Sequence, residues 1–178
     1  YMELMSEVIA RGGQALYLLP EIALTTQLTA RLQRYLGDQL AVYHSKLNNN
    51  ERVELWNAVL AGKPVVMGAR SALLLPFSRL ELIIVDEEHD PSFKQNDPAP
   101  RYNGRDSAVY LAQLHGGKVL LGTATPSVES YHNALGGKYG LVEMTERFGG
   151  VQMPEIVLAD ARLETKQRQM QSHFTSQL

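Results

Sequence analysis

Leu82-Ile83-Ile84-Val85-Asp86-Glu87-Glu88-His89 is the stretch of this chain that decides its fold. Its four apolar residues have the length and composition of a strand that is buried on both faces, as strands of a parallel sheet are. Three carboxylates follow directly, although like charges packed together are costly unless a cation offsets them. The stretch therefore predicts a buried strand that delivers acidic side chains to a nucleotide–metal site.

Short apolar runs of this kind alternate along the chain with amphipathic segments of helix length. This alternation requires crossover connections, so it predicts an α/β fold whose mostly parallel sheet is covered by helices on both faces. The predicted strands are residues 15–19, 40–43, 65–68, 82–85, 119–122 and 156–158, with a less regular candidate at 141–144. The predicted helices are residues 24–36, 50–61, 105–114 and 127–135, preceded by an amphipathic pattern that begins at Met2. Trp56, on the second of these helices, is expected to pack into the core.

The composition narrows the class of protein. The chain has 178 residues, 44% of them hydrophobic, which is enough for one well-buried core. With 17 Lys and Arg against 19 Asp and Glu, it lacks the basic excess of a protein that coats nucleic acid, so any such contact must be local. The absence of cysteine excludes disulfides and thiolate metal sites, and the histidines show no metal-ligand spacing. No membrane span or signal peptide is indicated, which favours a cytoplasmic protein.

Sheets of this kind place their chemistry outside the carboxyl ends of the strands. After the strand that ends at Val85, Asp86 could enter the coordination sphere of Mg²⁺. Glu87 could orient or deprotonate the water that attacks the γ-phosphate of a nucleotide. The alternative is that these acids cap the next helix, but Pro91 and the irregular sequence around it argue against an immediate helix.

Two more segments follow predicted strands. Residues 122–125 (Gly-Thr-Ala-Thr) offer two hydroxyls that could bond a carboxylate or an imidazole across the strand ends. The same string also occurs as a turn in which Thr125 or Ser127 caps the next helix. Arg70 and Ser71 could contact a nucleic-acid backbone without reading its bases, although a solvated surface arginine is about as common.

The long irregular stretch at residues 90–104 combines prolines with aromatic and cationic side chains. Aromatic faces beside cations hold single strands by stacking and charge. The charges of this stretch cancel, so a loop that senses bound nucleic acid is favoured over a primary binding site. The side chains concerned are Phe93, Lys94, Arg101 and Tyr102, together with Arg105 directly after the stretch.

Taken in order, these segments resemble the motifs of superfamily 2 helicases. Residues 18–25 are similar to motif Ia, 68–72 to motif Ib, 86–89 to motif II and 122–127 to motif III. Residues 86–95, followed by Arg101-Tyr102 and Arg105-Asp106, resemble motif II and the aromatic-rich loop of the bacterial replication-restart helicases, which are of the DExH type. The resemblance extends from Tyr1 to about Arg162.

This resemblance implies a RecA-like fold and an enzyme that hydrolyses ATP, with Mg²⁺, to translocate on single-stranded DNA. It implies that such an enzyme unwinds forked DNA near the bacterial nucleoid, together with primosome proteins and single-stranded-DNA-binding protein. The catalytic residues would be Asp86, Glu87 and His89, of which the first two would hold Mg²⁺ with ATP. Thr123 and Thr125 would couple hydrolysis to motion. The DNA-binding residues would be Pro20, Glu21, Thr25, Arg70, Ser71, Phe93, Lys94, Arg101, Tyr102 and Arg105.

The chain also departs from that family. It contains no G-x-x-x-x-G-K-[ST] phosphate loop, so we expect it to begin just after this loop and to lack the first strand. Residues 1–162 would form the truncated first lobe, and residues 163–178 the start of the connection to a second lobe. The chain alone is then expected to be inactive. Zinc belongs to a cysteine-rich region of the family that this chain does not contain.

Two alternatives remain. One is another superfamily 2 motor that acts on RNA or serves a restriction complex. The other is a non-catalytic RecA-like binding module.

Overall fold

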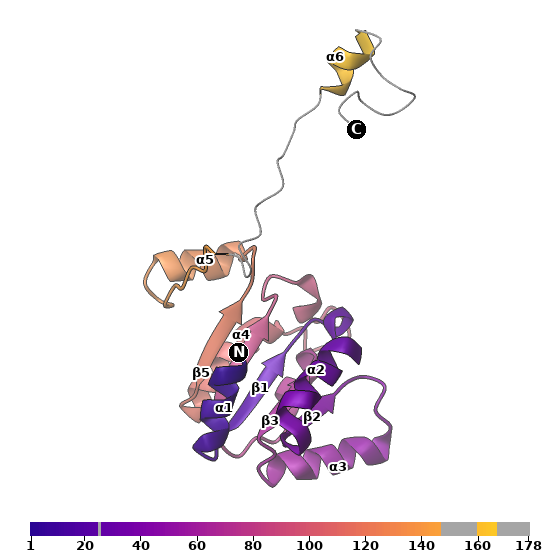
Figure 1. The fold of residues 1–178 in the computed structure, drawn as a ribbon, viewed down its shortest axis with the longest axis vertical. Helices are drawn as coiled ribbons and strands as arrows, with labels where there is room; N and C mark the ends of the chain where they lie inside the picture. The colour runs from indigo at the N-terminus through magenta and orange to yellow at the C-terminus, as the bar shows by residue number, and fades with distance from the viewer. Residues whose placement is uncertain (25, 147–159, 167–178) are drawn as a thin grey trace. The chain divides into compact units, whose positions relative to one another are not determined.

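The computed structural model describes residues 1–24, 26–146 and 160–166. The chain separates into two compact units, residues 1–139 and 140–178. The first unit contains a five-stranded, fully parallel sheet in the order β2-β3-β1-β4-β5 (Figure 1). In the described part of the second unit, regular structure is confined to the short helix α6 (Ala161–Lys166). The predicted α/β class with a parallel sheet is confirmed, whereas the predicted lobe boundary at residue 162 stays a prediction.

Five of the predicted strands are present, each within two residues of the expected ends. They are β1 (Gln14–Leu18), β2 (Leu40–Tyr43), β3 (Val65–Gly68), β4 (Leu80–Asp86) and β5 (Lys118–Gly122). β4 extends through Asp86 because this residue pairs with Gly122 of β5. The candidate strand at residues 141–144 is wrong, since no strand forms there and Val142 is 86% exposed. The candidate at residues 156–158 lies outside the described residues.

The four predicted helices and the amphipathic amino-terminal segment are helical. They are α1 (Met2–Ala10), α2 (Thr26–Leu36), α3 (Asn49–Leu60), α4 (Gly104–His115) and α5 (Val128–Leu135). The starts of α3, α4 and α5 follow from side-chain caps, because the side chains of Asn48, Asn103 and Ser127 accept hydrogen bonds from backbone N–H groups in the first turns of these helices. Gly116 ends α4 in a left-handed conformation, at φ +66°. Short 3-10 turns, η1 (Glu21–Ala23), η2 (Gly37–Gln39), η3 (Arg70–Leu74) and η4 (Pro91–Phe93), complete the first unit.

The sheet is covered on both faces, as predicted. Because side chains alternate along a strand, Leu16 of β1 faces one side and Tyr17 the other. Leu16 belongs to a core cluster that includes Val59 of α3 and Ala108 of α4. Tyr17 belongs to a second cluster with Met5 of α1 and Leu32 of α2, and these two helices lie in front of the sheet in Figure 1.

The predicted burial of Trp56 is wrong, because this residue is 46% exposed. α3 packs beside β2, which is an edge strand of the sheet. Only the stripe of Leu55 and Val59 reaches the core from this helix, and Trp56 lies beside that stripe. A helix that packs beside an edge strand has less of the sheet to cover. α3 therefore buries fewer of its apolar side chains than its sequence suggests.

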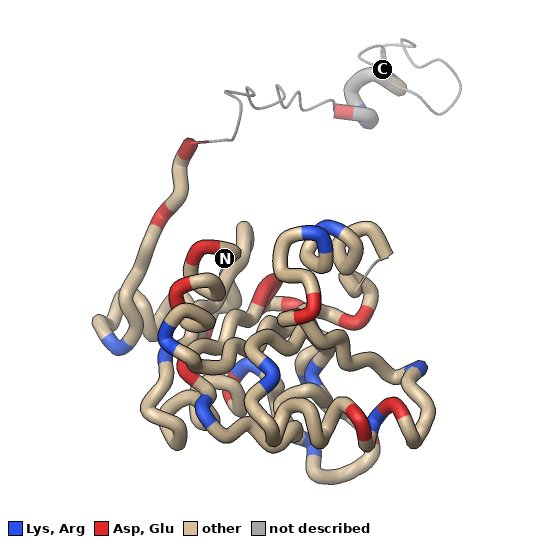
Figure 2. Tube along the Cα trace, turned by 60° about the horizontal axis from the view of Figure 1, so that its bottom comes forward, with Lys and Arg blue, Asp and Glu red and all other residues tan. Residues whose placement is uncertain are grey.

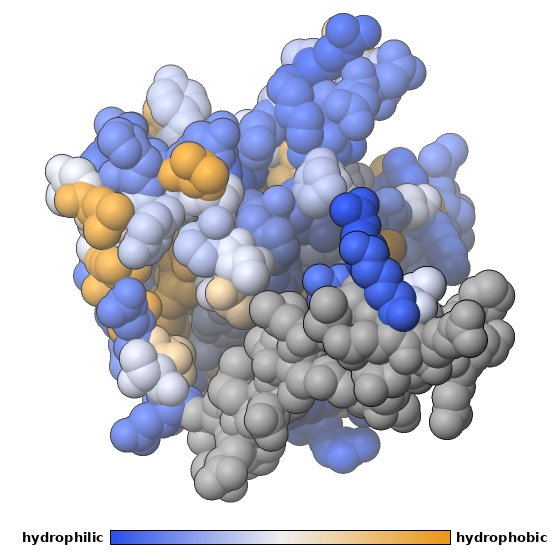
Figure 3. Space-filling model, turned by 90° about the horizontal axis from the view of Figure 1, so that it is seen from above, coloured by the Kyte–Doolittle hydropathy of each residue, from blue (hydrophilic) through white to orange (hydrophobic). Residues whose placement is uncertain are grey.

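The surface of the described residues is mixed in polarity. Seen from above, it is hydrophilic over much of its area, with a smaller group of hydrophobic side chains (Figure 3). Among the described residues, no helix is long and apolar enough to cross a membrane.

Candidate nucleotide and nucleic-acid site

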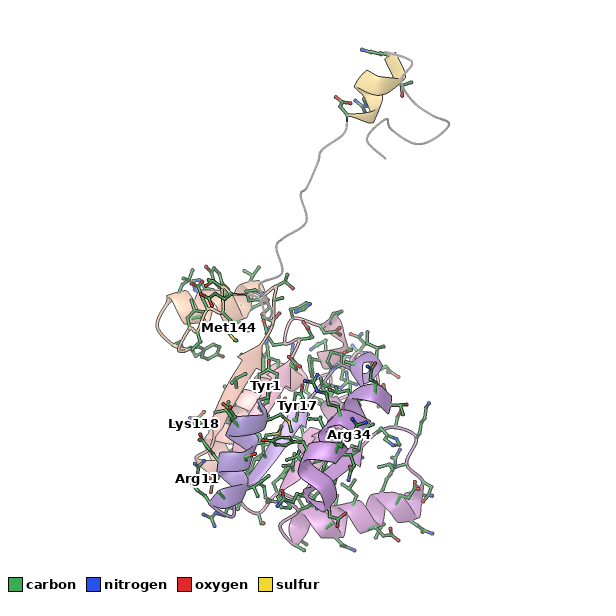
Figure 4. The ribbon with its side chains drawn as sticks, viewed as in Figure 1. Tyr1, Arg11, Tyr17, Arg34, Lys118 and Met144 are labelled. Atoms are coloured by element: carbon green, nitrogen blue, oxygen red, sulfur yellow. The ribbon has the colours of Figure 1, made fainter. Side chains whose placement is uncertain are left out.

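Asp86 ends β4, between β1 and β5, and two tyrosines orient its carboxylate. The Tyr17 hydroxyl donates to Asp86 Oδ2 at 2.8 Å, and the Tyr1 hydroxyl donates to Oδ1 at 3.0 Å. The two tyrosine rings meet edge to face with centroids 5.7 Å apart, and Figure 4 labels both. Since each carboxylate oxygen has a second lone pair, the oriented group can still bind a cation.

Burial, and next the interaction with Asp86, raises the pKa of both tyrosine hydroxyls. Both therefore stay protonated at neutral pH and remain hydrogen-bond donors. Neither tyrosine was predicted from the local sequence, because each reaches Asp86 from a segment far away in the chain. Tyr17 pairs with Ile84 in the neighbouring strand, two residues before Asp86 and on the same face of the sheet.

Glu87 stands in a tight turn just beyond the strand. Its φ is +51°, and the backbone carbonyl of Glu87 accepts a hydrogen bond from the Asp90 N–H at 2.8 Å. The Glu87 carboxylate is half exposed, and its Oε2 lies 3.6 Å from His89 Nδ1. The same imidazole nitrogen lies 2.8 Å from Thr123 Oγ1, which accepts from the Thr125 N–H at 3.0 Å. The structure thus brings together the acid, the imidazole and the hydroxyl that the sequence suggested would meet across the strand ends.

Glu88, the third acid, turns away from this group into the protein. The residue is 2% exposed, and its carboxylate accepts four hydrogen bonds. The donors are the Ser127 N–H at 2.7 Å, the Ser127 hydroxyl at 2.9 Å, the Ser130 hydroxyl at 2.8 Å and Arg105 Nη1 at 3.2 Å. The sequence did not predict this arrangement, because its members lie just after β4, in the first turn of α4 and at the start of α5, and no local pattern links them.

These contacts decide how Glu88 titrates. Burial alone would raise the pKa of the Glu88 carboxyl, but hydrogen bonds from Ser127, Ser130 and Arg105 outweigh it and hold that pKa below its usual range. Arg105 is also buried, which opposes its charge, yet its bonds to Asp106 and Glu88 raise the guanidinium pKa. Both groups therefore stay ionised in the folded chain.

The lowered pKa makes Glu88 a source of acid sensitivity. Because the folded state binds this proton less readily than the unfolded state, the stabilisation is complete above the unfolded pKa of about 4.3 and is lost as pH falls through the folded pKa. Glu88→Gln should therefore reduce the pH dependence of the unfolding free energy of the chain below about pH 5. Urea unfolding at a series of pH values measures this, with Glu129→Gln, at a carboxylate that is 72% exposed, as the control. If the unfolding free energy changed with pH equally in the wild type and in Glu88→Gln, the lowered pKa of Glu88 would be contradicted.

The stretch at residues 90–104 is an ordered hairpin-like loop. Lys94 and Asn103 form an antiparallel bridge, and the Gln95 N–H donates to the Tyr102 carbonyl at 2.9 Å. At its start, Asp90 caps η4, and hydrogen bonds from Ser92 lower the pKa of the Asp90 carboxyl.

The predicted DNA-contacting side chains of this loop fall into two groups. Phe93 is 1% exposed within the core, and Arg105 is 9% exposed beside Glu88. Neither offers a stacking face or a free charge in this structure. Lys94 and Arg101 are exposed, and Tyr102 is half-buried with the Arg70 guanidinium 5.6 Å from its ring centroid. The accessible contact surface is therefore the Arg70–Tyr102 pair with the two exposed cations.

The other predicted DNA-contacting residues lie after β1 and β3. Pro20 is buried ahead of η1, and Glu21 is exposed and accepts a hydrogen bond from the Ser45 hydroxyl. Arg70 Nη1 donates to the Ser92 carbonyl at 2.9 Å, which ties η3 to η4, while Ser71 is exposed. Thr25 lies outside the described residues. Basic and acidic residues are interspersed along the described part of the trace in Figure 2.

The residues at the tip of β4 fit a magnesium ion held with a nucleotide. Asp86 and Glu87 supply hard oxygen donors, and among the described residues no group of three or more His, Cys, Asp or Glu forms a metal cage. Mg²⁺ is usually held by one or two carboxylates together with substrate phosphates and water. Zinc, which prefers nitrogen and sulfur ligands, has no such set in the described part of the chain.

Comparison with known proteins assigns the chain to a family. Residues 2–134 match the DEAD/DEAH box helicase family. Replication restart protein PriA of Bacillus subtilis is 40% identical over 167 residues, which cover 93% of this chain and 21% of that protein. PriA of Haemophilus influenzae is 42% identical over 150 residues, covering 84% of this chain and 20% of that protein. The chain thus spans about a fifth of the length of these curated relatives.

Among solved structures, the C-terminal domain of S. cerevisiae Dbp5 is similar at a TM-score of 0.47 and 16% identity, with 81% of each chain covered. The family match covers most of the chain, including all five strands and the residues at their carboxyl ends. The chain belongs to the DEAD/DEAH box helicase family.

Proposed function

We propose that this chain is part of an ATP-dependent DNA helicase that restarts stalled replication forks. The intact protein would translocate on single-stranded DNA, unwind forked DNA and help to assemble the primosome. Identity of 36–42% to PriA proteins across most of the chain supports this proposal. The observation that carries it is the contact between Glu87, His89 and Thr123 at the carboxyl ends of β4 and β5.

The geometry suggests how the residues divide the work. Bound Mg²⁺ would neutralise charge that develops on the phosphates of ATP. Asp86, held by two tyrosine hydroxyls, presents a fixed carboxylate to the metal–nucleotide complex. Glu87, half exposed, orients the attacking water and accepts its proton. His89 links this acid to Thr123, which directly follows β5, so a shift of the loop after β5 changes the environment of Glu87.

The proposed partners follow from the same activity. Single-stranded and forked DNA would be the substrates, and single-stranded-DNA-binding protein and primosome proteins would be the protein partners. Such an enzyme would work in the bacterial cytoplasm, at replication forks of the nucleoid.

The test compares ATP hydrolysis by the intact protein in the presence of matched DNA and RNA forks. We expect phosphate release that DNA stimulates, together with unwinding of the DNA fork. Stimulation by RNA but not by DNA would instead favour an RNA motor of the same superfamily. No nucleotide turnover in the intact protein would favour a binding module. The chain by itself is expected to release no phosphate, because its sequence lacks the G-x-x-x-x-G-K-[ST] motif that cradles phosphates.

Tyr102→Ala in the intact protein should weaken the response to DNA. The Arg70 guanidinium lies over the face of the Tyr102 ring. Loss of the ring removes a stacking surface and leaves the Arg70 cation without its aromatic partner. A base stacked on an aromatic side chain contributes about 1–3 kcal/mol to binding. The DNA concentration that gives half-maximal ATPase stimulation should therefore rise about 5-fold or more.

Tyr110→Ala is the matched control for this change, because Tyr110 is an exposed tyrosine on α4 away from the loop. It should leave the DNA requirement of the ATPase unchanged. If the two substitutions had equal effects, Tyr102 would not be part of the DNA contact surface.

A further inference from the structure

Glu87 has an unusual backbone conformation. Among the described residues it is the one non-glycine residue with a positive φ, at +51°. An L-residue in this region costs about 1–2 kcal/mol, and such strain persists only where the surroundings fix it. The turn that contains the candidate water-activating carboxylate therefore needs an anchor.

The anchor is the next residue. The Glu88 N–H donates to the Gly122 carbonyl at 3.1 Å, which holds the turn against the end of β5. The Glu88 side chain is 1% exposed and is held by hydrogen bonds from Ser127, Ser130 and Arg105. Backbone and side chain of this residue are thus both fixed, immediately after the strained position.

We propose that Glu88 is a positioning residue whose buried carboxylate, held by Arg105, Ser127 and Ser130, fixes the left-handed backbone of Glu87 and so aims the Glu87 carboxylate at the attacking water. The inference rests on the proposed function, because it assigns Glu88 a part in the same hydrolysis. It adds a residue that would touch neither ATP nor water and would act through its neighbour.

Stability alone is a weak reason for such an arrangement. Replacing a buried ion pair by well-packed apolar residues is often neutral or stabilising, so the pair gains little for the fold as such. The network does fix the position of the Glu88 side chain, because donors from three segments converge on its carboxylate. Arg105 lies in the first turn of α4, Ser127 caps α5, and Ser130 lies in the first turn of α5. A displacement of any of them moves the residue that follows Glu87.

The test uses the intact protein with Glu88→Gln, Glu87→Gln, the double variant, and Glu129→Gln as the control. Glu129 carries the same charge 3.9 Å from the same Arg105 nitrogen, but its side chain is 72% exposed. Measured are kcat and KM of DNA-stimulated ATP hydrolysis, affinity for a fluorescent ATP analogue, and the thermal midpoint. Glu88→Gln should lower kcat about 10- to 100-fold, since small misplacements of a catalytic group have effects of this size. KM and analogue affinity should stay within about 2-fold, because the lost interaction serves the transition state only.

The double variant separates positioning from general damage. If Glu88 acts through Glu87, adding Glu88→Gln to Glu87→Gln should lower kcat by no more than about 2-fold, since coupled residues are not additive. A full additional loss in the double variant, an unchanged kcat in Glu88→Gln, or a loss of analogue affinity equal to the loss of kcat would overturn the proposal. So would an equal effect of Glu129→Gln.

Two further comparisons keep the result decisive. If Glu88→Gln does not fold, Ser130→Ala removes one donor to Glu88 and leaves Arg105 paired, and it should lower kcat about 3-fold with the same non-additivity. Full additivity of Ser130→Ala with Glu87→Gln would overturn the proposal in that case. A wild-type protein that hydrolyses ATP while Glu88→Gln is unaffected refutes only the positioning role. A wild-type protein with no DNA-stimulated hydrolysis refutes the proposed function and this inference with it.

Discussion

Glu87→Gln in the intact protein is expected to lower DNA-stimulated ATP hydrolysis by about 10²- to 10⁴-fold, the range for loss of a general acid–base group. Glutamine keeps the size of the side chain but has no negative charge and accepts no proton from water. The Glu87 carboxylate is half exposed beyond the end of β4, where a nucleotide and water can reach it. Phosphate release at saturating ATP and DNA measures the effect, and titration with a fluorescent ATP analogue should show nearly unchanged affinity because Asp86 is intact.

The same substitution at Glu129 provides the control, since this exposed carboxylate on α5 lies outside the group formed by Glu87, His89 and Thr123. Its rate should equal that of the wild type. A Glu87→Gln protein that turns over ATP at the wild-type rate would show that another group activates the water. His89, 3.6 Å from Glu87, would then be the next candidate.

The fold could be predicted from the sequence because its strands are buried on both faces. Continuous apolar runs such as residues 65–68 and 82–85 stand out against amphipathic helices, and glycine or asparagine marks many of the boundaries. The failures have a common cause. Residues 141–144 are apolar apart from Glu143 but form no strand, and Trp56 lies on a helix beside an edge strand. In both cases the environment outside the local segment decides burial.

The candidate site could be predicted only in part. Asp86, Glu87 and Thr123 could be proposed as site residues because they lie at or just after the ends of two strands, and parallel strands end at one edge of the sheet. Tyr17 needed knowledge of the strand order, since β1 and β4 are neighbours in space but are far apart in the chain. Phe93 and Arg105 were predicted as DNA contacts from residue type, yet the turn η4 and the first turn of α4 direct both inward.

Arg105→Ala is expected to have a large effect on the stability of the fold. The change leaves the Glu88 carboxylate buried, with its side chain 1% exposed and its cationic partner removed. Removing one partner of a buried ion pair costs about 3–5 kcal/mol, because the remaining charge is desolvated without compensation. Urea unfolding of the chain at neutral pH, followed by circular dichroism, should show a loss of this size in the free energy of unfolding.

Two other arginine substitutions show whether that loss arises from the buried charge. Arg79→Ala removes a partner of Glu81 at 3.2 Å, but Arg79 is 61% exposed, so the expected cost is only about 0–1 kcal/mol. Arg105→Lys keeps the positive charge but lacks the planar fork that reaches Glu88, Ser127 and Asp106 together. Its loss of unfolding free energy should therefore lie between those of Arg79→Ala and Arg105→Ala. A loss below about 1 kcal/mol for Arg105→Ala would mean that water or the serine donors satisfy Glu88 unaided. The serines donate neutral hydrogen bonds, whereas Arg105 alone brings the opposite charge into the buried network, and for that reason we expect the large value.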